Sequence, residues 1–345
     1  MIKTYCIKNN SNKTIDITNI TKDGSKLQKA INEFAWIYEF NITRNEIFFD
    51  VEVGDIIVVK LDNKEIFSGV VIVGDITNLK YKAIDYTWYF AKNEEIYQFE
   101  DVEASIVITK LIETFGGKLG NIEKTNTMVD KFYFGKTLGS IIKEIIDNIK
   151  KLENQEFRFF YKDTKFHFER SKKNKYLRKE YQPLESLKAI LNDYQYNALN
   201  YIEEPKRNTS IEEMHNSIKV YKTSGKEYIQ VSGAKDKEKI DKYGLMQKLV
   251  EFKDNDLNKG TISADNILIQ ESKIKESLNI DIPTLSEFIQ DGEILKLNYE
   301  NYGINGVYEV KSISYTFTNH KTIFKASLQL ERVEEWQKNK SIIIQ

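Results

Sequence analysis

The 345-residue sequence has one cysteine, three prolines and three histidines. Because Cys6 is alone, the chain can form neither an internal disulfide nor a thiolate metal cage. No apolar run reaches the roughly 18 residues that a membrane-spanning helix needs. The first residues also lack the apolar core of a signal peptide. We therefore expect assembly in the cytoplasm and no membrane partner.

Charge of either sign is not in excess. The chain has 51 basic and 52 acidic residues, for a net charge of −1. Duplex DNA binding draws on a basic surplus, so we expect no specific nucleic-acid binding. With 41% apolar and 30% charged residues, the composition is that of a globular protein. The length suits about two to four small domains.

Strand patterns dominate both ends of the sequence. Residues 1–92 contain alternating and aromatic segments and predict an all-β barrel or curled sheet. Residues 69–88 and 306–331 both begin Gly-Val, run along a strand, turn at Thr-Asn and return. Similar strands precede them at 54–61 and 291–299. The sequence therefore predicts the same β-unit twice. In the last strand, Leu328 and every second neighbour are apolar and should face inward.

The middle of the chain changes to helical spacing. Helices are predicted at about 102–115 and 137–153, the second with Thr137 as its N-cap. Its apolar stripe comprises Leu138, Ile141, Ile142, Ile145, Ile149 and Leu152. An aromatic hairpin follows at about 157–168. These elements predict a small α+β domain.

The second half mixes strands with helical segments. Ser210 and Glu213 have the spacing of a capping box and predict a short helical turn that leads into a strand at 218–223. A charged loop is expected at 234–244, and a helix at about 263–280. The apolar side of that helix should contain Ala264, Ile267, Ile274 and Leu278.

The residues most often used in catalysis or metal binding are poorly placed for either. His167 lies on the polar face of a hairpin, His215 in a helical turn, and His320 in a hairpin turn. No two have metal-ligand spacing. Cys6 lies in an expected strand without a base to activate it. We predict no catalytic, cofactor-binding or metal-binding residue and no cofactor.

Other motifs also have simpler interpretations. Paired acids occur at 94–95, 203–204 and 334–335, but 52 acidic residues single out no pair for glycoside hydrolysis, and a charged surface is the simpler interpretation. The segment 115–120, "FGGKLG", lacks dinucleotide-binding and P-loop spacing and predicts a helix stop. Aromatic residues reach 12%, which favours core and protein interfaces, because base stacking would accompany basic charge.

Several short motifs follow one another in a recognisable order. They comprise Asp85, Tyr86, Trp88 and Asn93; then Gly116, Gly120 and Ile122; then Gly135, Lys136, Thr137 and Leu138. Segments 210–220, 241–252 and 306–331 continue the pattern, and 171–208 is its least recognisable part. In this order the chain resembles the baseplate hub proteins of contractile phage tails and of phage-tail-like (R-type) bacteriocins.

The resemblance implies an α+β, β-rich fold with two tube-like β-barrel domains, at 1–92 and 181–345. A small α+β spacer domain at 93–180 separates them, and a helical insertion lies around 233–282 of the second. It also implies a homotrimer whose six barrels adapt a sixfold tail tube to a threefold central spike. Pairing of edge strands between barrels would close the ring. Neighbouring baseplate proteins are further implied partners, within a tail or tail-like particle assembled in the bacterial cytoplasm.

Two other functions stay open from the sequence. A tail-associated peptidoglycan-degrading enzyme would need a catalytic domain with an acid pair, and the predicted domains leave no segment for one. A carbohydrate- or nucleic-acid-binding β-protein would need an exposed aromatic face without a partner chain. The sequence does not distinguish a phage from a DNA-free bacteriocin.

Overall fold

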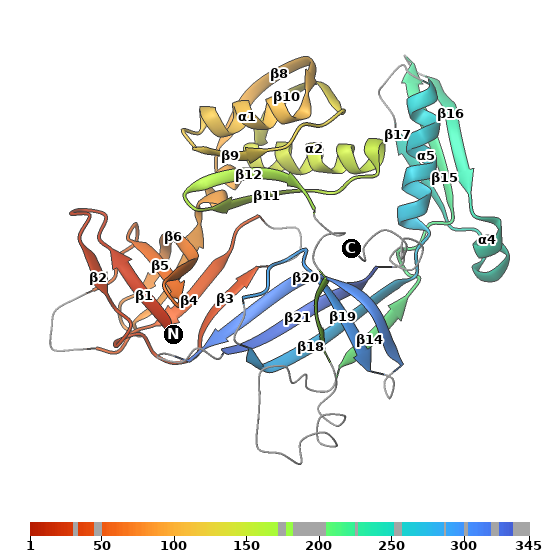
Figure 1. Ribbon diagram of the computed structural model, residues 1–345. Coiled ribbons are helices and arrows are strands. Elements are labelled where there is room, and N and C mark those ends of the chain that lie inside the picture. The colour runs from red at the N-terminus through yellow and green to blue at the C-terminus, as the bar shows by residue number, and fades with distance from the viewer. Residues whose placement is uncertain are drawn as a thin grey trace, which may run out of the picture.

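The computed structural model describes residues 1–29, 34–44, 50–171, 177–181, 205–224, 227–251, 257–285, 288–299, 303–318 and 324–333. Two β-units lie side by side, and two smaller parts stand above them (Figure 1). We call these smaller parts the spacer, which follows the first β-unit in the chain, and the insertion, which interrupts the second.

The first β-unit contains seven strands and ends in a 3-10 helix, η1 (Tyr86–Ala91). Its strands are β1 (Ile2–Ile7), β2 (Thr14–Asp16), β3 (Ser25–Lys29), β4 (Ile37–Asn41), β5 (Ile56–Leu61), β6 (Lys64–Asp75) and β7 (Lys80–Asp85). Asp62 and Asn63 both have positive φ, which is the geometry of the two-residue turn that joins β5 and β6 in a hairpin.

The second β-unit contains six strands. They are β13 (Leu177–Tyr181), β14 (Lys206–Ser210), β18 (Lys275–Leu285), β19 (Ile294–Tyr299), β20 (Ile304–Phe317) and β21 (Phe324–Arg332). In β21, Leu328 and its alternate neighbours are buried, as the sequence predicts. The "TNHK" turn between β20 and β21, with His320, lies mostly outside the described residues.

The two β-units have the same strand order. The first runs β3-β4-β7-β6-β5-β1, and the second runs β14-β18-β21-β20-β19-β13. Neighbours pair antiparallel in both, except that β13 pairs parallel with β19. The short sequence echo therefore marks a repeated topology, in which β3 corresponds to β14 and β6 corresponds to β20.

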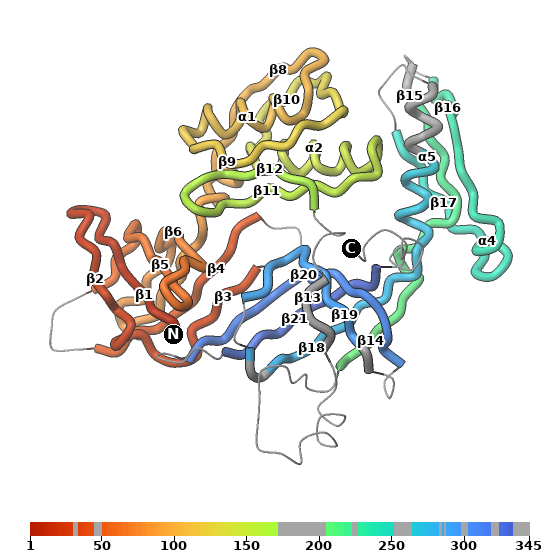
Figure 2. Tube along the Cα trace, viewed as in Figure 1, coloured from red at the N-terminus to blue at the C-terminus, as the bar shows by residue number. Residues whose placement is uncertain are grey.

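Both β-units belong to one 13-stranded sheet. β3 pairs antiparallel with the second half of β20, with Leu27 opposite Tyr315. Figure 2 shows these two strands side by side, and Ser312 Oγ donates to the Lys29 carbonyl at 3.1 Å across 283 residues of sequence. Among the described residues no barrel is closed. The two tube-like barrels expected from the sequence are instead two curled units with a shared sheet, because β20 occupies the edge of β3.

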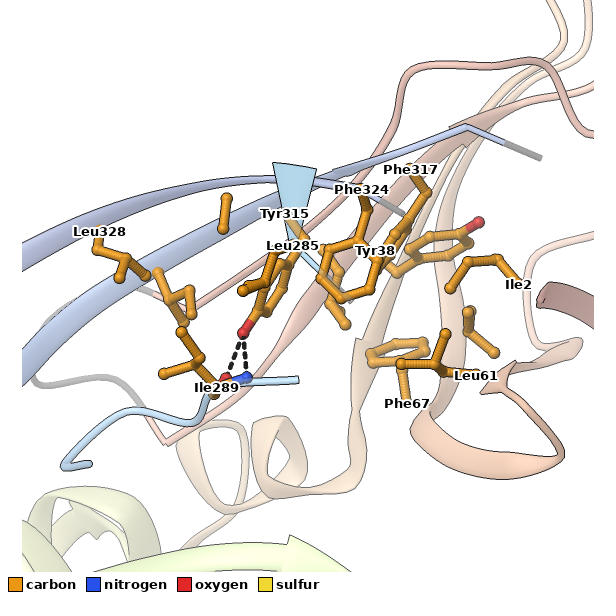
Figure 3. Packing of buried hydrophobic residues seen from close by; sticks show 14 of the residues in the cluster. Ile2, Tyr38, Leu61, Phe67, Leu285, Ile289, Tyr315, Phe317, Phe324 and Leu328 are labelled. Carbon is orange, nitrogen blue, oxygen red and sulfur yellow. Dashed lines mark hydrogen bonds between the residues drawn. The ribbon is translucent and has the colours of Figure 1, made fainter. Parts of the chain in front are cut away.

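One hydrophobic core continues through this joint. Tyr38 and Phe67 of the first β-unit and Tyr315, Phe317 and Phe324 of the second belong to the same buried cluster (Figure 3). The Tyr315 hydroxyl accepts from Ile289 N at 2.8 Å and also bonds to the Ile289 carbonyl, so its polar end is satisfied. Continuous aromatic packing makes the joint part of the fold.

The spacer packs two helices against two small sheets. Its elements are β8 (Glu94–Glu103), α1 (Ala104–Thr114), β9 (Leu119–Ile122), β10 (Met128–Thr137), α2 (Leu138–Glu153), β11 (Phe157–Lys162) and β12 (Lys165–Arg170). Thr137 caps α2 by accepting from Ser140 N, as predicted. The predicted stripe of α2 is buried apart from half-buried Leu152. The β11–β12 hairpin is also confirmed.

The insertion lies between β14 and β18 and is not all helical. It contains β15 (Ser217–Ser224), β16 (Glu227–Lys235), α4 (Lys237–Tyr243), β17 (Gln247–Glu251) and α5 (Leu257–Glu271). α5 covers one face of the three-stranded sheet and contacts α2 of the spacer.

Three predictions in this region are wrong. Residues 211–216 form turns, because Ser210 Oγ accepts from Glu212 N and no helix follows. The expected charged loop contains α4, which Asp236 caps by accepting from Lys239 N. α5 ends at Glu271, so Ile274 precedes β18 and Leu278 lies within it.

Candidate assembly interface

Three parts of the chain meet around Asp291, which precedes β19. Lys29 Nζ of β3 lies 3.0 Å from its carboxylate, and Arg158 Nη1 of β11 donates to its carbonyl at 2.7 Å. Lys29 is only 6% exposed. Burial opposes ionisation of Asp291, but the charges of Lys29 and Arg158 outweigh it and keep the pKa of this carboxyl below its usual value. These contacts tie the first β-unit, the second β-unit and the spacer together.

Asp85 anchors the start of η1 beside this junction. Its oxygens accept hydrogen bonds from Trp36 N at 2.8 Å, Thr87 N at 2.9 Å and the Thr87 hydroxyl. Burial raises the pKa of Asp85 to about 6, although these bonds oppose the rise. A perturbed carboxyl in a cleft is a common sign of catalysis, but these three donors give Asp85 a structural role.

A cleft of about 660 Å³ opens at the same junction. Its lining comes from the first β-unit, the β11–β12 hairpin and the segment before β19, and includes Lys64, Glu65, Phe160, His167 and Gln290. Burial, and next the charge of Asp163, raise the pKa of Glu65. The cleft mixes both signs of charge.

Two open strand edges lie at distant parts of the sheet. The first open edge belongs to β6. Along one side, β6 pairs with β5 only as far as Val70, and no described strand pairs with residues 72–75 of β6 on that side. Val53, Val73 and Ile76 gather there with 65%, 52% and 68% of their surfaces exposed. Monomeric proteins seldom leave such a strand edge uncovered.

β14 forms the other open edge. It pairs with β18 alone among the described strands, and all five of its residues are exposed. Arg207 holds it in place through Glu276 Oε2 of β18 at 3.0 Å. Glu276 also receives Arg332 at 3.0 Å and the Tyr308 hydroxyl at 2.8 Å. Burial opposes ionisation, yet these hydrogen bonds lower the pKa of Glu276.

His167, His215 and Cys6 make local contacts. His167 stacks on Phe160 with ring centroids 5.1 Å apart and accepts from Asn121 N. His215 Nδ1 lies 3.0 Å from Glu271 Oε2 of α5. Cys6 is buried beside Asp55, and burial first of all raises the pKa of its thiol to about 12, which makes it a poor nucleophile.

The remaining sequence motifs add no chemistry that we can identify. Glu94 and Glu95 are exposed on β8, whereas the pairs at 203–204 and 334–335 lie outside the described residues. Gly116 follows α1 with a φ of +78°, in keeping with a helix stop. In the described part of the chain, no three potential ligands gather as a metal site. No described helix has both the length and the apolar character to cross a bilayer.

The sequence signals for the open edges were weak. Exposed Val73 and Ile76 look like ordinary strand residues in the sequence, and β14 is a short polar segment. The strand-order repeat is the only signal that relates them, and it becomes visible when the strands are paired.

Comparisons with known proteins agree with this architecture. The phage-like element PBSX protein XkdQ of Bacillus subtilis (strain 168) is 23% identical over 335 residues, which cover 93% of this chain and 94% of that protein. A tail protein from Neisseria meningitidis MC58 matches with a TM-score of 0.68 at 12% identity, over 96% of both chains.

A more distant structure has a related fold. It is an E. coli component of the type VI secretion system, described as similar to the T4 bacteriophage tail proteins gp27 and gp5. It matches with a TM-score of 0.53 at 8% identity and covers 91% of this chain and 74% of its own. The chain therefore has the fold of phage tail proteins. A family model described as YQBQ-like matches residues 26–331, and the chain belongs to this YQBQ-like family.

Proposed function

We propose that the chain is the structural baseplate hub of a contractile tail, a homotrimer that adapts the sixfold tail tube to the threefold central spike. One observation carries the proposal: the same strand order occurs twice in one chain, and the two copies are joined edge to edge. Three such chains present six similar units, which is what a trimer needs in order to meet a sixfold ring.

The joint within the chain suggests how the ring closes. Inside one chain, β3 adds to the second half of β20. β14 is the counterpart of β3 in the second β-unit, and its outer edge is open among the described strands. Residues 72–75 of β6 are the counterpart of the second half of β20, and they are open on the corresponding side. If the same joint forms between chains, β14 of one copy pairs with β6 of the next. Repeating this step closes the ring and covers both edges.

The tail tube, the central spike and neighbouring baseplate proteins are the proposed partners, and the particle is a phage tail or a phage-tail-like bacteriocin. The descriptions of the similar proteins support a tail component. The proposed role is structural, because Asp85, a cleft carboxyl whose pKa burial raises, is held by three local donors.

Cryo-electron microscopy of purified particles tests the proposal. We expect three copies of this chain between tube and spike. Six equivalent copies, or copies at the fibre tips, would contradict the hub role. A clear zone from the isolated chain on a peptidoglycan zymogram would favour the enzyme instead.

Cysteine pairs test the joint itself. We expect Asn208→Cys to cross-link with Ile72→Cys, Val73→Cys or Gly74→Cys between copies in intact particles. Native Cys6 is buried and should not interfere. Asn208→Cys combined with a cysteine at exposed Lys110 of α1 serves as a control that should give no cross-link.

A further inference from the structure

We propose a second contact between copies, above the β-units: an apolar ridge on the spacer of one copy binds the outer face of the insertion sheet of the next. The proposal rests on the proposed ring of identical chains. It uses surfaces that lie outside the sheet edges described above.

The ridge lies on the two-stranded ribbon of β8 and β10. Ile96, Phe132 and Phe134 are 55%, 57% and 72% exposed. The opposite face of the ribbon carries Tyr97 and Tyr133, which are buried in the spacer core. The ridge is thus the unpartnered face of an amphipathic ribbon in the described structure, and three large apolar side chains on it are costly to leave in water.

A strand irregularity lies at one end of the ridge. The pairing of β8 with β10 shifts register between Tyr133 and Lys136, where Gly135 has a φ of +59°. Such bulges bend a strand and locally interrupt its pairing. Phe134 sits in this bulge and is among the most exposed aromatic residues of the described chain.

The ridge is also acidic. β8 and β10 together contain six acidic and two basic residues. Both basic residues, Lys131 and Lys136, point to α2 and bind Glu144. Exposed Glu100 shares the ridge face with Ile96, because they are four residues apart on one strand. A partner surface should therefore be apolar with positive charge.

The insertion sheet offers such a surface. α5 covers the face that contains Ile218 and Val220. The other face presents Leu249 and Tyr228, which are 63% and 76% exposed, and Lys219, which lies opposite Leu249. Exposed Lys235, next to buried Ala234, adds a second lysine to this face and Glu251 adds one acid, whereas Lys248 pairs with Glu271 of α5. Charge complementarity thus favours this face, and not the ridge of another copy, as the surface that covers the ridge.

The contact has to form between two molecules. α5 lies between the insertion sheet and α2, and Gln270 Nε2 donates to the Lys150 carbonyl at 3.2 Å. The outer face consequently points away from its own spacer, as Figure 1 shows at the far side of β16 and β15. Two different surfaces that bind each other between copies make a heterologous contact, which is the kind that builds rings.

Cross-linking in assembled particles tests this contact. A chain with both Phe134→Cys and Leu249→Cys, treated with a short bismaleimide, should convert mostly to covalent oligomers. A chain with Ile106→Cys and Leu249→Cys is the matched control, because Ile106 on α1 is 56% exposed but lies off the ridge. Phe134→Ser should lower particle yield about tenfold, as expected for an aromatic side chain lost from an interface, and Ile106→Ser should not.

The outcomes separate this inference from the hub proposal. If microscopy places three copies between tube and spike and the 134–249 cross-link is absent, the second contact is wrong and the hub stands. If the cross-link forms in particles with another copy number or place, the contact stands and the hub is wrong. Cross-linking of the Phe134→Cys thiol to a different baseplate protein also overturns the proposed occupant.

Discussion

β3 and β14 occupy the same place in two equivalent units, but their surroundings differ. β3 alternates buried and exposed residues and is paired on both sides, with β4 and with β20. β14 is exposed at every residue and is paired on one side only in the described structure. One chain therefore completes one joint of this kind, and in the proposed ring the other joint forms with a second molecule.

The composition of the two strands fits these roles. β3 places Leu27, which is fully buried, in the core beneath the joint. β14 has the sequence "KRNTS", whose charged and polar side chains suit an open strand edge. The comparison shows that equivalent strands need not share hydrophobicity when one is covered on both sides and the other is open on one side.

A charge placed in the core beneath the β3–β20 joint should cause the largest loss of stability. Leu27→Asp places an unpaired carboxylate in the shared core and should lower the free energy of unfolding by about 4 kcal/mol or more. Thr209→Asp, on the exposed β14, should leave it within about 0.5 kcal/mol of the original. Urea denaturation of the two purified variants measures both values. Equal losses would refute the difference between the strands.

The stability of the region near the β3–β20 joint and that of the β14 edge should also depend on pH in opposite directions. The pKa of Asp85, near the covered joint, rises from 3.8 to about 6 on folding. Its stabilising contribution is therefore complete below about pH 4 and is lost as the pH rises through about 6, a change of up to about 3 kcal/mol. Asp85→Asn should flatten the dependence of unfolding free energy on pH between 4 and 7.

The pKa of Glu276, whose carboxylate binds Arg207 of β14, shifts in the opposite direction to that of Asp85. Its folded pKa is lowered, so its stabilising contribution is present above the unfolded pKa and is lost as the pH falls through the folded value. After correction for the intrinsic exchange rate at each pH, the protection of β14 amides should fall in acid, while protection near β3 should rise. A loss of protection in both regions would show that the unit titrates as a whole.

Removing the Glu276 carboxylate should have the smallest effect on the whole fold and a clear effect on β14. Glu276→Ala removes an acceptor that the Tyr308 hydroxyl, Arg207 and Arg332 share, and should cost about 2 kcal/mol. Arg207 should then release β14, which hydrogen exchange at 206–210 would detect. Lys325→Ala, at an exposed position of β21, is the control and should change neither stability nor exchange.

Local elements could be predicted from the sequence where one face is buried. The Thr137 cap of α2, most of its stripe and the β11–β12 hairpin are confirmed because they depend on neighbouring residues. α4 could not be found by periodicity, since none of its side chains is buried. Asp236 before it and Gly244 after it were the available signals.

Long-range features needed the structure. The pairing of Leu27 with Tyr315 depends on the whole fold, and nothing in either segment specifies the other. The echo at 69–88 and 306–331 correctly indicated a repeat, but the sequence did not reveal that the two copies share a sheet. The domain boundaries at 92 and 180 stay predictions.

The pairing of β3 with β20 also sets an order of events during synthesis. At about 5–20 residues per second, β3 leaves the ribosome on the order of a minute or less before β20 is complete. During that interval β4 can fold onto one side of β3 while the other side stays uncovered, and loop closure over nearly the whole chain is slow. The joint that covers β3 in the finished molecule therefore cannot form until nearly the whole chain has been made, and until then one edge of β3 is open to other chains.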